Sequence, residues 1–240
     1  MSGDATFTLD GKTIPFEPGD TIMDAALRAG EYIPHLCHNP EFKPHGSCRV
    51  CIVDIRGRKV SACTQPAAAG LEALSQTEEI TAQRRALLQM LFVEGNHVCP
   101  GCEKSGACQL QAVAYYTNML SPHFTHFFPR RALDASHPDT VIDFDRCILC
   151  ELCVRASREI DGKDVFAIAG RGIGSHLVVD SPSGRLGDSV FSAEDKAAHV
   201  CPVGAILPKH SGFDRPIGER LYDRQPISQV GDVAAHEDGV

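Results

Sequence analysis

Three groups of cysteines carry the chemistry that this sequence can do. The chain has 11 cysteines, and within each group a spacing of two intervening residues recurs. Thiolates at such spacings are soft, anionic ligands that suit iron–sulfur clusters or zinc. The groups are Cys37, Cys48, Cys51 and Cys63; Cys99, Cys102 and Cys108; and Cys147, Cys150, Cys153 and Cys201. With one further ligand in the second group, the sequence predicts three redox centres.

The first group has the composition of a [2Fe–2S] site. Such a cluster needs two thiolates on each iron, which four cysteines supply. Gly46 and Ser47 stand before Cys48, and small residues let backbone N–H groups approach the sulfurs. The alternative is a structural zinc site. Zinc sites usually present two Cys-x2-Cys pairs, whereas this group has only Cys48-Arg49-Val50-Cys51.

The second group lacks a fourth cysteine. Its three cysteines lie in a short segment with Pro and Gly, and His97 stands two residues before the first of them. An imidazole nitrogen can ligate iron, so His97 is the candidate fourth ligand of a [4Fe–4S] cluster. His123 and His126 are rival candidates. A surface histidine, with water or a distant group as the fourth ligand, also stays open.

The third group is the most specific motif. Its first three cysteines follow the Cys-x2-Cys-x2-Cys run of bacterial two-cluster ferredoxins, and Cys201-Pro202 matches the Cys-Pro ending of that pattern. The positions that would bind the other cluster hold Ser157, Phe191, Glu194 and Ala197. We therefore expect a two-cluster module that has lost one cubane. A zinc site would use the same cysteines but would not explain the Cys-Pro ending.

The bulk composition is ordinary for a soluble globular protein, with 43% hydrophobic and 22% charged residues. The net charge of -8 argues against a nucleic-acid surface. We find no apolar run long enough to cross a membrane and no secretory signal, so we expect a cytoplasmic protein with reduced thiols. Arg155 and Arg158 follow the third group at helical spacing; they either offset its negative charge or are ordinary surface residues.

The elements that position the first group should form a β-grasp [2Fe–2S] ferredoxin domain over residues 1–77. Asp10-Gly11 predicts a tight hairpin, and Pro15 places its second strand at a sheet edge. Asp20 is expected to cap the helix that follows. The strands expected here cover residues 6–9, 13–16, 51–55 and 59–62.

The remaining elements complete an α+β chain. Residues 78–120 should form a small helical [4Fe–4S] domain with one His and three Cys ligands, opened by a long helix from Thr77 to about Val93. Residues 121–210 should form a bacterial-ferredoxin-like [4Fe–4S] domain. Residues 211–240 mix Gly, Pro and charges without periodicity, so we expect an extended C-terminal tail, ordered only against a partner.

The three cysteine groups, in their order along the chain, resemble those of a known family. They are similar to the N-terminal region of the iron–sulfur subunit of respiratory complex I and of iron-only hydrogenases. The length of the chain and the run Gly95-Asn96-His97-Val98-Cys99-Pro100 look most like the small diaphorase subunit of cytoplasmic NAD-reducing [NiFe] hydrogenases. One departure is that the wider family has His-x3-Cys where this chain has His-x-Cys. The other matching motifs are Ile33-Pro34-His35-Leu36-Cys37, Gly46-Ser47-Cys48-Arg49-Val50-Cys51, Cys147-Ile148-Leu149-Cys150 and Cys201-Pro202-Val203-Gly204-Ala205.

The resemblance implies one [2Fe–2S] and two [4Fe–4S] clusters, with no flavin, nicotinamide or catalytic residue on this chain. It implies that the chain relays electrons between an FMN- and NAD-binding diaphorase large subunit and the small and large subunits of a [NiFe] hydrogenase. The complex would convert H2 and NAD+ to NADH and a proton. Two alternatives stay open: an electron-transfer subunit of an NAD-dependent formate dehydrogenase or other complex I-like assembly, and a cluster- or zinc-stabilised binding or regulatory module.

Overall fold

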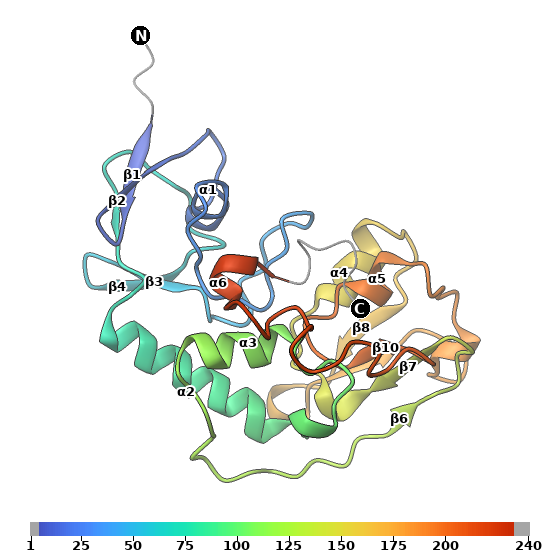
Figure 1. Ribbon diagram of the computed structural model, residues 1–240. Coiled ribbons are helices and arrows are strands. Elements are labelled where there is room, and N and C mark those ends of the chain that lie inside the picture. Colours follow the sequence, from blue (N-terminus) through green and yellow to red (C-terminus); the bar gives the residue numbers. More distant parts are fainter. Residues whose placement is uncertain (1–4, 233–240) are drawn as a thin grey trace.

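The computed structural model describes residues 5–232. An N-terminal unit of sheet and helix is followed by two helices that lie beneath it, and then by a unit of short strands and helices (Figure 1). The last described segment returns across the middle of the molecule. The three cysteine groups lie in loops and at helix ends between these elements.

The first sheet has the strand order β2-β1-β5. Strands β1 (Thr6–Leu9) and β2 (Lys12–Pro15) form an antiparallel hairpin, and β5 (Glu72–Ala73) pairs with β1 in parallel. Asp10 and Gly11 both have positive φ, of 51° and 81°. This is the backbone that an Asp-Gly turn favours, so the predicted hairpin is confirmed. Pro15 lies on the edge strand, as expected.

Helix α1 (Ile22–Arg28) crosses this sheet and begins one residue later than predicted. Its N-cap is Thr21, whose hydroxyl accepts from the Asp24 N–H while the Asp24 carboxylate accepts from the Thr21 N–H. This reciprocal capping box leaves Asp20 outside the cap, so the predicted capping residue was wrong. Strands β3 (Ile52–Ile55) and β4 (Arg58–Ser61) form the second hairpin.

Two helices connect the N-terminal unit to the rest of the chain. Helix α2 (Glu78–Glu94) begins after Thr77, whose side chain accepts from the Ile80 N–H. This confirms the predicted start of the long helix. Helix α3 (Gln109–Tyr116) packs against α2. The short 3-10 turn Cys99–Gly101 lies between them and carries part of the second cysteine group.

The third unit contains a sheet of order β10-β7-β6 and a separate hairpin. Helix α4 (Leu152–Glu159) begins within the third cysteine group and contacts α5 (Lys196–His199), which ends just before Cys201. The strands are β6 (Leu133–Asp134), β7 (Thr140–Asp143), β8 (Phe166–Ala169), β9 (His176–Val179) and β10 (Ile206–Pro208). Further 3-10 turns cover Phe144–Arg146, Gly172–Gly174 and Leu186–Asp188.

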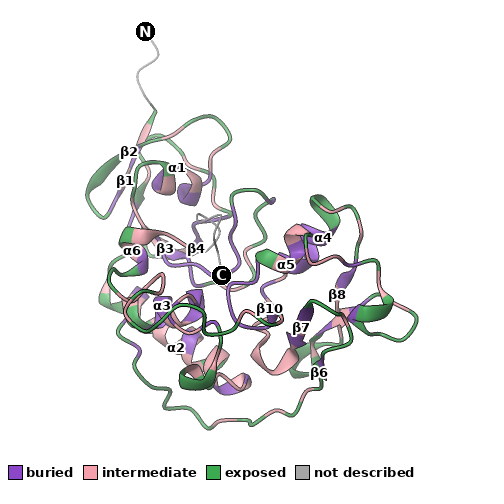
Figure 2. Cartoon of the chain, turned by 45° about the vertical axis from the view of Figure 1, so that its right-hand side comes forward, coloured by how far each residue is buried: buried purple, intermediate pink, exposed green. Residues whose placement is uncertain are grey.

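The buried side chains form two cores, which appear as purple segments in Figure 2. One fills the N-terminal unit. The other is larger and joins Leu36 and Cys37 of the first unit to Leu110 of α3 and Ile142 of β7. The loop that carries the first cysteine group is therefore packed against both later units. No helix among the described residues has the length and apolar character needed to span a membrane.

The C-terminal segment differs from the expected extended tail. Helix α6 (Ile227–Val230) packs against α3, and Ile227 is only 1% exposed. Beyond it, an Asp232 carboxylate oxygen lies 2.8 Å from Nε2 of the buried His35. Only a few apolar residues take part in this docking, so the sequence shows no helical periodicity of apolar residues there. Residues 233–240 lie outside the described part of the chain.

Candidate metal centres

The first cysteine group is brought together beside the N-terminal sheet. The Sγ atoms of Cys51 and Cys63 lie 3.4 Å apart, and the Cys48 N–H donates to Cys37 Sγ over 3.4 Å. Contact with the Cys48 thiol, aided by nearby N–H groups and opposed by burial, lowers the pKa of Cys37 to about 5. The four thiols thus form two pairs, the arrangement in which each iron of a binuclear centre would have two ligands.

Backbone conformation shapes this first loop. Gly46 has a φ of +74°, and a Cβ there would lie 2.9 Å from Thr64 Cγ2. Glycine is therefore needed at this position both for its conformation and for its lack of volume. Arg49 also has a positive φ, of 59°, between the second and third cysteines. These turns bend the segment so that N–H groups approach sulfur, as the small residues predicted.

The second group lines a small cavity. Its three cysteines and His97 all face this space, whereas the rival candidates His123 and His126 are absent from its lining. Nε2 of His97 is buried and has no hydrogen-bond partner among the described residues. Burial, with help from nearby cations that include Arg146, lowers the pKa of His97 to about 4. At neutral pH the ring therefore offers an uncharged nitrogen lone pair.

Two glycines let the chain close around this second cavity. A Cβ on Gly95 would lie 2.6 Å from His97 Nε2 and 2.7 Å from the Asp145 carbonyl oxygen. A Cβ on Gly204 would lie 2.9 Å from Cys102 Sγ. Neither glycine has a φ in the left-handed region, so each is required for close approach and not for backbone conformation. Gly204 follows Cys201 closely, so the third unit forms part of the second cavity wall.

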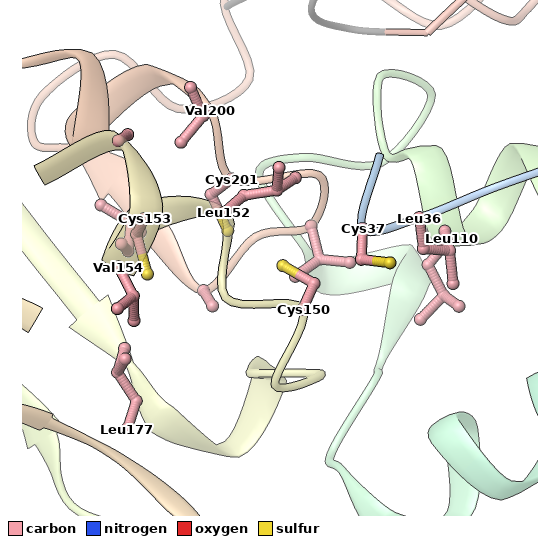
Figure 3. Packing of buried hydrophobic residues seen from close by; sticks show 14 of the residues in the cluster. Leu36, Cys37, Leu110, Cys150, Leu152, Cys153, Val154, Leu177, Val200 and Cys201 are labelled. Atoms are coloured by element: carbon pink, nitrogen blue, oxygen red, sulfur yellow. The ribbon is translucent and has the colours of Figure 1, made fainter. Parts of the chain in front are cut away.

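The third group lines another small cavity with all four of its cysteines. Leu149 and Glu151 have φ values of 53° and 60°, which turn the chain between successive cysteines. Figure 3 shows the Cys150, Cys153 and Cys201 side chains in this region, with Cys37 of the first group close to Cys150. Burial raises the pKa of Cys147 to about 11, so metal binding here must displace thiol protons.

The four positions where a second ferredoxin cluster would be expected do not line a cysteine cavity. Ser157, Phe191 and Ala197 are buried, whereas Glu194 is exposed. Ser157 Oγ accepts from the Val165 N–H over 2.9 Å. Phe191 packs edge-on against Phe166, with ring centroids 5.8 Å apart. Apolar packing and a hydrogen bond occupy this part of the unit.

The donor chemistry fits polynuclear iron. All 11 cysteines are free of disulfides. Within residues 5–232, no three His, Cys, Asp or Glu side chains converge on a position suited to one metal ion. In the second and third groups the candidate ligands instead line small cavities, with sulfur and one imidazole as donors. Soft donors around such a space suit an iron–sulfur cluster.

Sequence reasoning missed several cations near these centres. Lys104 is buried, and burial lowers its pKa, whereas the thiols of Cys201, Cys108 and Cys102 act in the opposite direction. Arg84 is also buried, at 1% exposure. Arg155, expected near the third group, donates to the carbonyl oxygen of Cys37 in the first. No local sequence signal marks these partners, because they come from distant parts of the chain.

Family models match the three units in order. Residues 4–78 match a 2Fe-2S iron-sulfur cluster binding domain, residues 84–123 match the NADH-ubiquinone oxidoreductase-G iron-sulfur binding region, and residues 141–207 match a 4Fe-4S single cluster domain. The chain therefore carries iron–sulfur domains, first of the [2Fe–2S] and then of the [4Fe–4S] type, built from mixed helix and sheet.

Individual proteins extend this similarity over nearly the whole chain. The gamma subunit of the NAD-reducing hydrogenase HoxS of Cupriavidus necator is 41% identical over 222 residues, covering 92% of this chain and 94% of that protein. The mitochondrial 78 kDa subunit of NADH-ubiquinone oxidoreductase of Candida albicans is 29% identical; the match covers 86% of this chain but 29% of that longer protein. A chain in the crystal structure of an NAD+-reducing [NiFe]-hydrogenase in the H2-reduced state superposes with a TM-score of 0.93. It is 53% identical, and the match covers 98% of this chain and 100% of that chain.

Proposed function

Because the chain belongs to the family of the gamma subunit of the NAD-reducing hydrogenase HoxS, we propose that it relays electrons between a [NiFe] hydrogenase module and an FMN- and NAD-binding diaphorase module. It is an iron–sulfur electron-transfer subunit of an oxidoreductase, related to the 78 kDa subunit of NADH-ubiquinone oxidoreductase. The reaction of the whole complex is the conversion of H2 and NAD+ to NADH and a proton. This chain carries charge and performs no bond chemistry.

The observation that supports the proposal is that one buried core contains cysteines from all three candidate ligand sets. Cys37 of the first set and Cys150 of the third belong to the same buried cluster. The second set adjoins the third, because the Gln109 N–H donates to the Pro202 carbonyl oxygen over 2.8 Å. The first and second sets thus both lie against the third, and this arrangement favours electron transfer through the chain.

We assign the ligands as the sequence predicts. Clusters of this kind supply reversible one-electron transfer when bound. His97 is supported as the fourth ligand of the second set by its orphaned, uncharged Nε2 in the cysteine-lined cavity. The assignment is Cys37, Cys48, Cys51 and Cys63 for one [2Fe–2S] cluster; His97, Cys99, Cys102 and Cys108 for a [4Fe–4S] cluster; and Cys147, Cys150, Cys153 and Cys201 for another.

The domain proposal follows from this assignment. We propose a β-grasp domain at 1–77, a helical domain at 78–120 and a ferredoxin-like domain at 121–210 that has lost one cubane. The buried Ser157, Phe191 and Ala197 support that loss, since packed side chains stand where ligands would be needed. A cytoplasmic location is proposed with it.

The partners proposed are the FMN- and NAD-binding diaphorase large subunit and the small and large subunits of the [NiFe] hydrogenase. A native pull-down under anaerobic conditions, followed by metal analysis, tests this directly. Nickel in the captured complex is expected. Molybdenum without nickel would favour a formate dehydrogenase subunit instead. Zinc as the only metal, with no acid-labile sulfide, would favour a binding or regulatory module.

The ligand assignment is tested by His97→Cys on the anaerobically prepared full chain. A thiolate carries a negative charge where the imidazole is neutral, so we expect the four-iron cluster to be retained at a more negative midpoint potential. His126→Cys is the matched control, because His126 does not line the cavity. An unchanged potential in His97→Cys, measured by redox titration followed by EPR, would make His97 a bystander.

A further inference from the structure

A buried arginine of helix α2 binds the loop of the first cysteine group. Arg84 is 1% exposed and donates four hydrogen bonds within the N-terminal unit. Its Nε reaches the Val50 carbonyl oxygen over 2.9 Å, and one Nη reaches that of Ile52 over 2.8 Å. The other Nη reaches the Ser75 carbonyl oxygen over 2.7 Å. Two of these acceptors flank Cys51, so Arg84 fixes the backbone on both sides of a ligand.

A second buried arginine, on helix α4, binds the opposite end of the same loop. Arg155 donates to the carbonyl oxygen of Cys37 and, over 3.0 Å, to that of Lys43. Its guanidinium lies 5.5 Å from the centre of the Phe42 ring. Arg155 Nε has no hydrogen-bond partner among the described residues. The two arginines therefore reach the first group from two different units of the chain.

Neither guanidinium forms an ion pair with a carboxylate in residues 5–232; their acceptors are neutral carbonyl and hydroxyl groups. Burial lowers the pKa of Arg84 to about 10, so it still carries its charge at neutral pH. A buried charge without a counter-ion is costly. Both cations lie beside candidate ligands of the first centre, because Arg84 binds the backbone on both sides of Cys51 and Arg155 binds the Cys37 carbonyl oxygen. Thiolates there would supply compensating negative charge.

We propose that Arg84 and Arg155 form a cationic clamp on the first centre: they hold the ends of its loop and raise its midpoint potential. A cation stabilises the reduced, more negative state over the oxidised one through Coulomb attraction, which is strong in a buried setting. Both arginines are positioning residues: they hold backbone carbonyls of the loop and bring their charge close to the centre. The inference rests on the assignment of a [2Fe–2S] cluster to the first group.

The test uses the full chain prepared anaerobically, with variants Arg84→Met and Arg155→Met. Charge-retaining variants Arg84→Lys and Arg155→Lys accompany them. The matched controls are Arg85→Met on α2 and Arg158→Met on α4, since Arg85 bonds to Thr117 and the exposed Arg158 pairs with Asp164. Midpoint potentials of all clusters come from redox titration followed by EPR, and the second cluster, with His97 as its proposed ligand, serves as the internal reference.

We expect both methionine variants to shift the [2Fe–2S] potential to more negative values while the potential of the second cluster stays within error. The lysine variants should keep the potential closer to wild type but lose the planar fork. Amide hydrogen exchange in residues 46–51 should then be faster in Arg84→Lys. Both control variants should match the wild type in potential and exchange.

Two results would overturn the inference: unchanged [2Fe–2S] potentials in both methionine variants, or lysine variants shifted as far as methionine ones. If methionine prevents cluster binding, a native potential in the lysine variants supports the charge role. Loss of the cluster in every variant, lysine included, would leave only a structural role and would also overturn it. A wild-type chain without a [2Fe–2S] signal would instead refute the assignment on which the inference rests.

Discussion

The contact between Gly204 and the second centre makes a sharp prediction. An alanine Cβ at 204 would lie 2.9 Å from Cys102 Sγ, 3.2 Å from Lys104 Cβ and 3.4 Å from an Arg146 Nη. Because the added methyl group would press on all three neighbours, the Cys102 side chain must shift from its position in the cavity wall. Overpacking of this kind costs about 1–3 kcal/mol. If that cost falls on the metal-bound state, Gly204→Ala weakens retention of the second cluster by about 5- to 150-fold.

Gly101→Ala is the matched control. Gly101 immediately precedes Cys102, and a Cβ there meets nothing within 4 Å. Its φ is not in the left-handed region, so alanine fits and should stabilise the chain by about 0.4–1 kcal/mol through the unfolded state. The two variants add the same methyl group near the same ligand, but only the one at 204 meets packed neighbours.

The assay is iron and acid-labile sulfide content together with EPR of the dithionite-reduced chain, before and after timed exposure to a chelator. We expect Gly204→Ala to lose the second cluster selectively and faster, while the [2Fe–2S] and third-cluster signals persist. Gly101→Ala should match the wild type. Equal retention in the two alanine variants would refute the reasoning that the third unit closes the second cavity through Gly204.

Three further predictions concern other parts of the chain. Cys150→Ala should lose the third cluster and destabilise residues 141–207, because ligation and folding are coupled there. Iron content measures the loss of the cluster, and amide hydrogen exchange measures the loss of stability. A normal iron content would contradict this prediction. Ile227→Ala should destabilise the chain by about 2–4 kcal/mol in denaturant unfolding, whereas Ile217→Ala, at an 86% exposed position, should change it by under about 0.5 kcal/mol. Burial, with His35 nearby, lowers the pKa of His38 from 6.5 to about 4, so the folded state binds this proton less readily than the unfolded state. The free energy of unfolding that is present above pH 6.5 should therefore fall by about 3 kcal/mol as the pH drops toward 4, at 1.36 kcal/mol per pKa unit. His38→Gln should flatten this part of the stability curve in pH-dependent unfolding, and an unchanged curve would contradict the reasoning.

Local signals predicted local structure well. The Asp10-Gly11 hairpin, the start of α2 at Thr77 and the grouping of cysteines all follow from residues close together in sequence. The α1 cap was misplaced because Asp20 and Thr21 are both good caps. The choice depends on Asp24, whose carboxylate accepts from the Thr21 N–H and completes the capping box.

Long-range contacts were beyond the sequence. The docking of the tail involves the buried Ile227, Tyr222, whose N–H donates to the Gly106 carbonyl oxygen, and a bond between residues 197 positions apart. Arg155 lies 118 residues from the Cys37 carbonyl that it binds, so its helical spacing from the third group gave no sign of this contact with the first. His97 was a candidate by proximity alone. Its orphaned Nε2 and the glycine that makes room for it become visible only once the cavity is formed.

The bond between His35 and Asp232 also bears on how the chain matures. The two residues are 197 positions apart, and ribosomes add about 5–20 residues per second. The segment leading into Cys37 therefore emerges about 10–40 s before the residue that finally covers it. During that interval His35 is not yet bonded to Asp232, and the segment that leads into Cys37 folds without this contact.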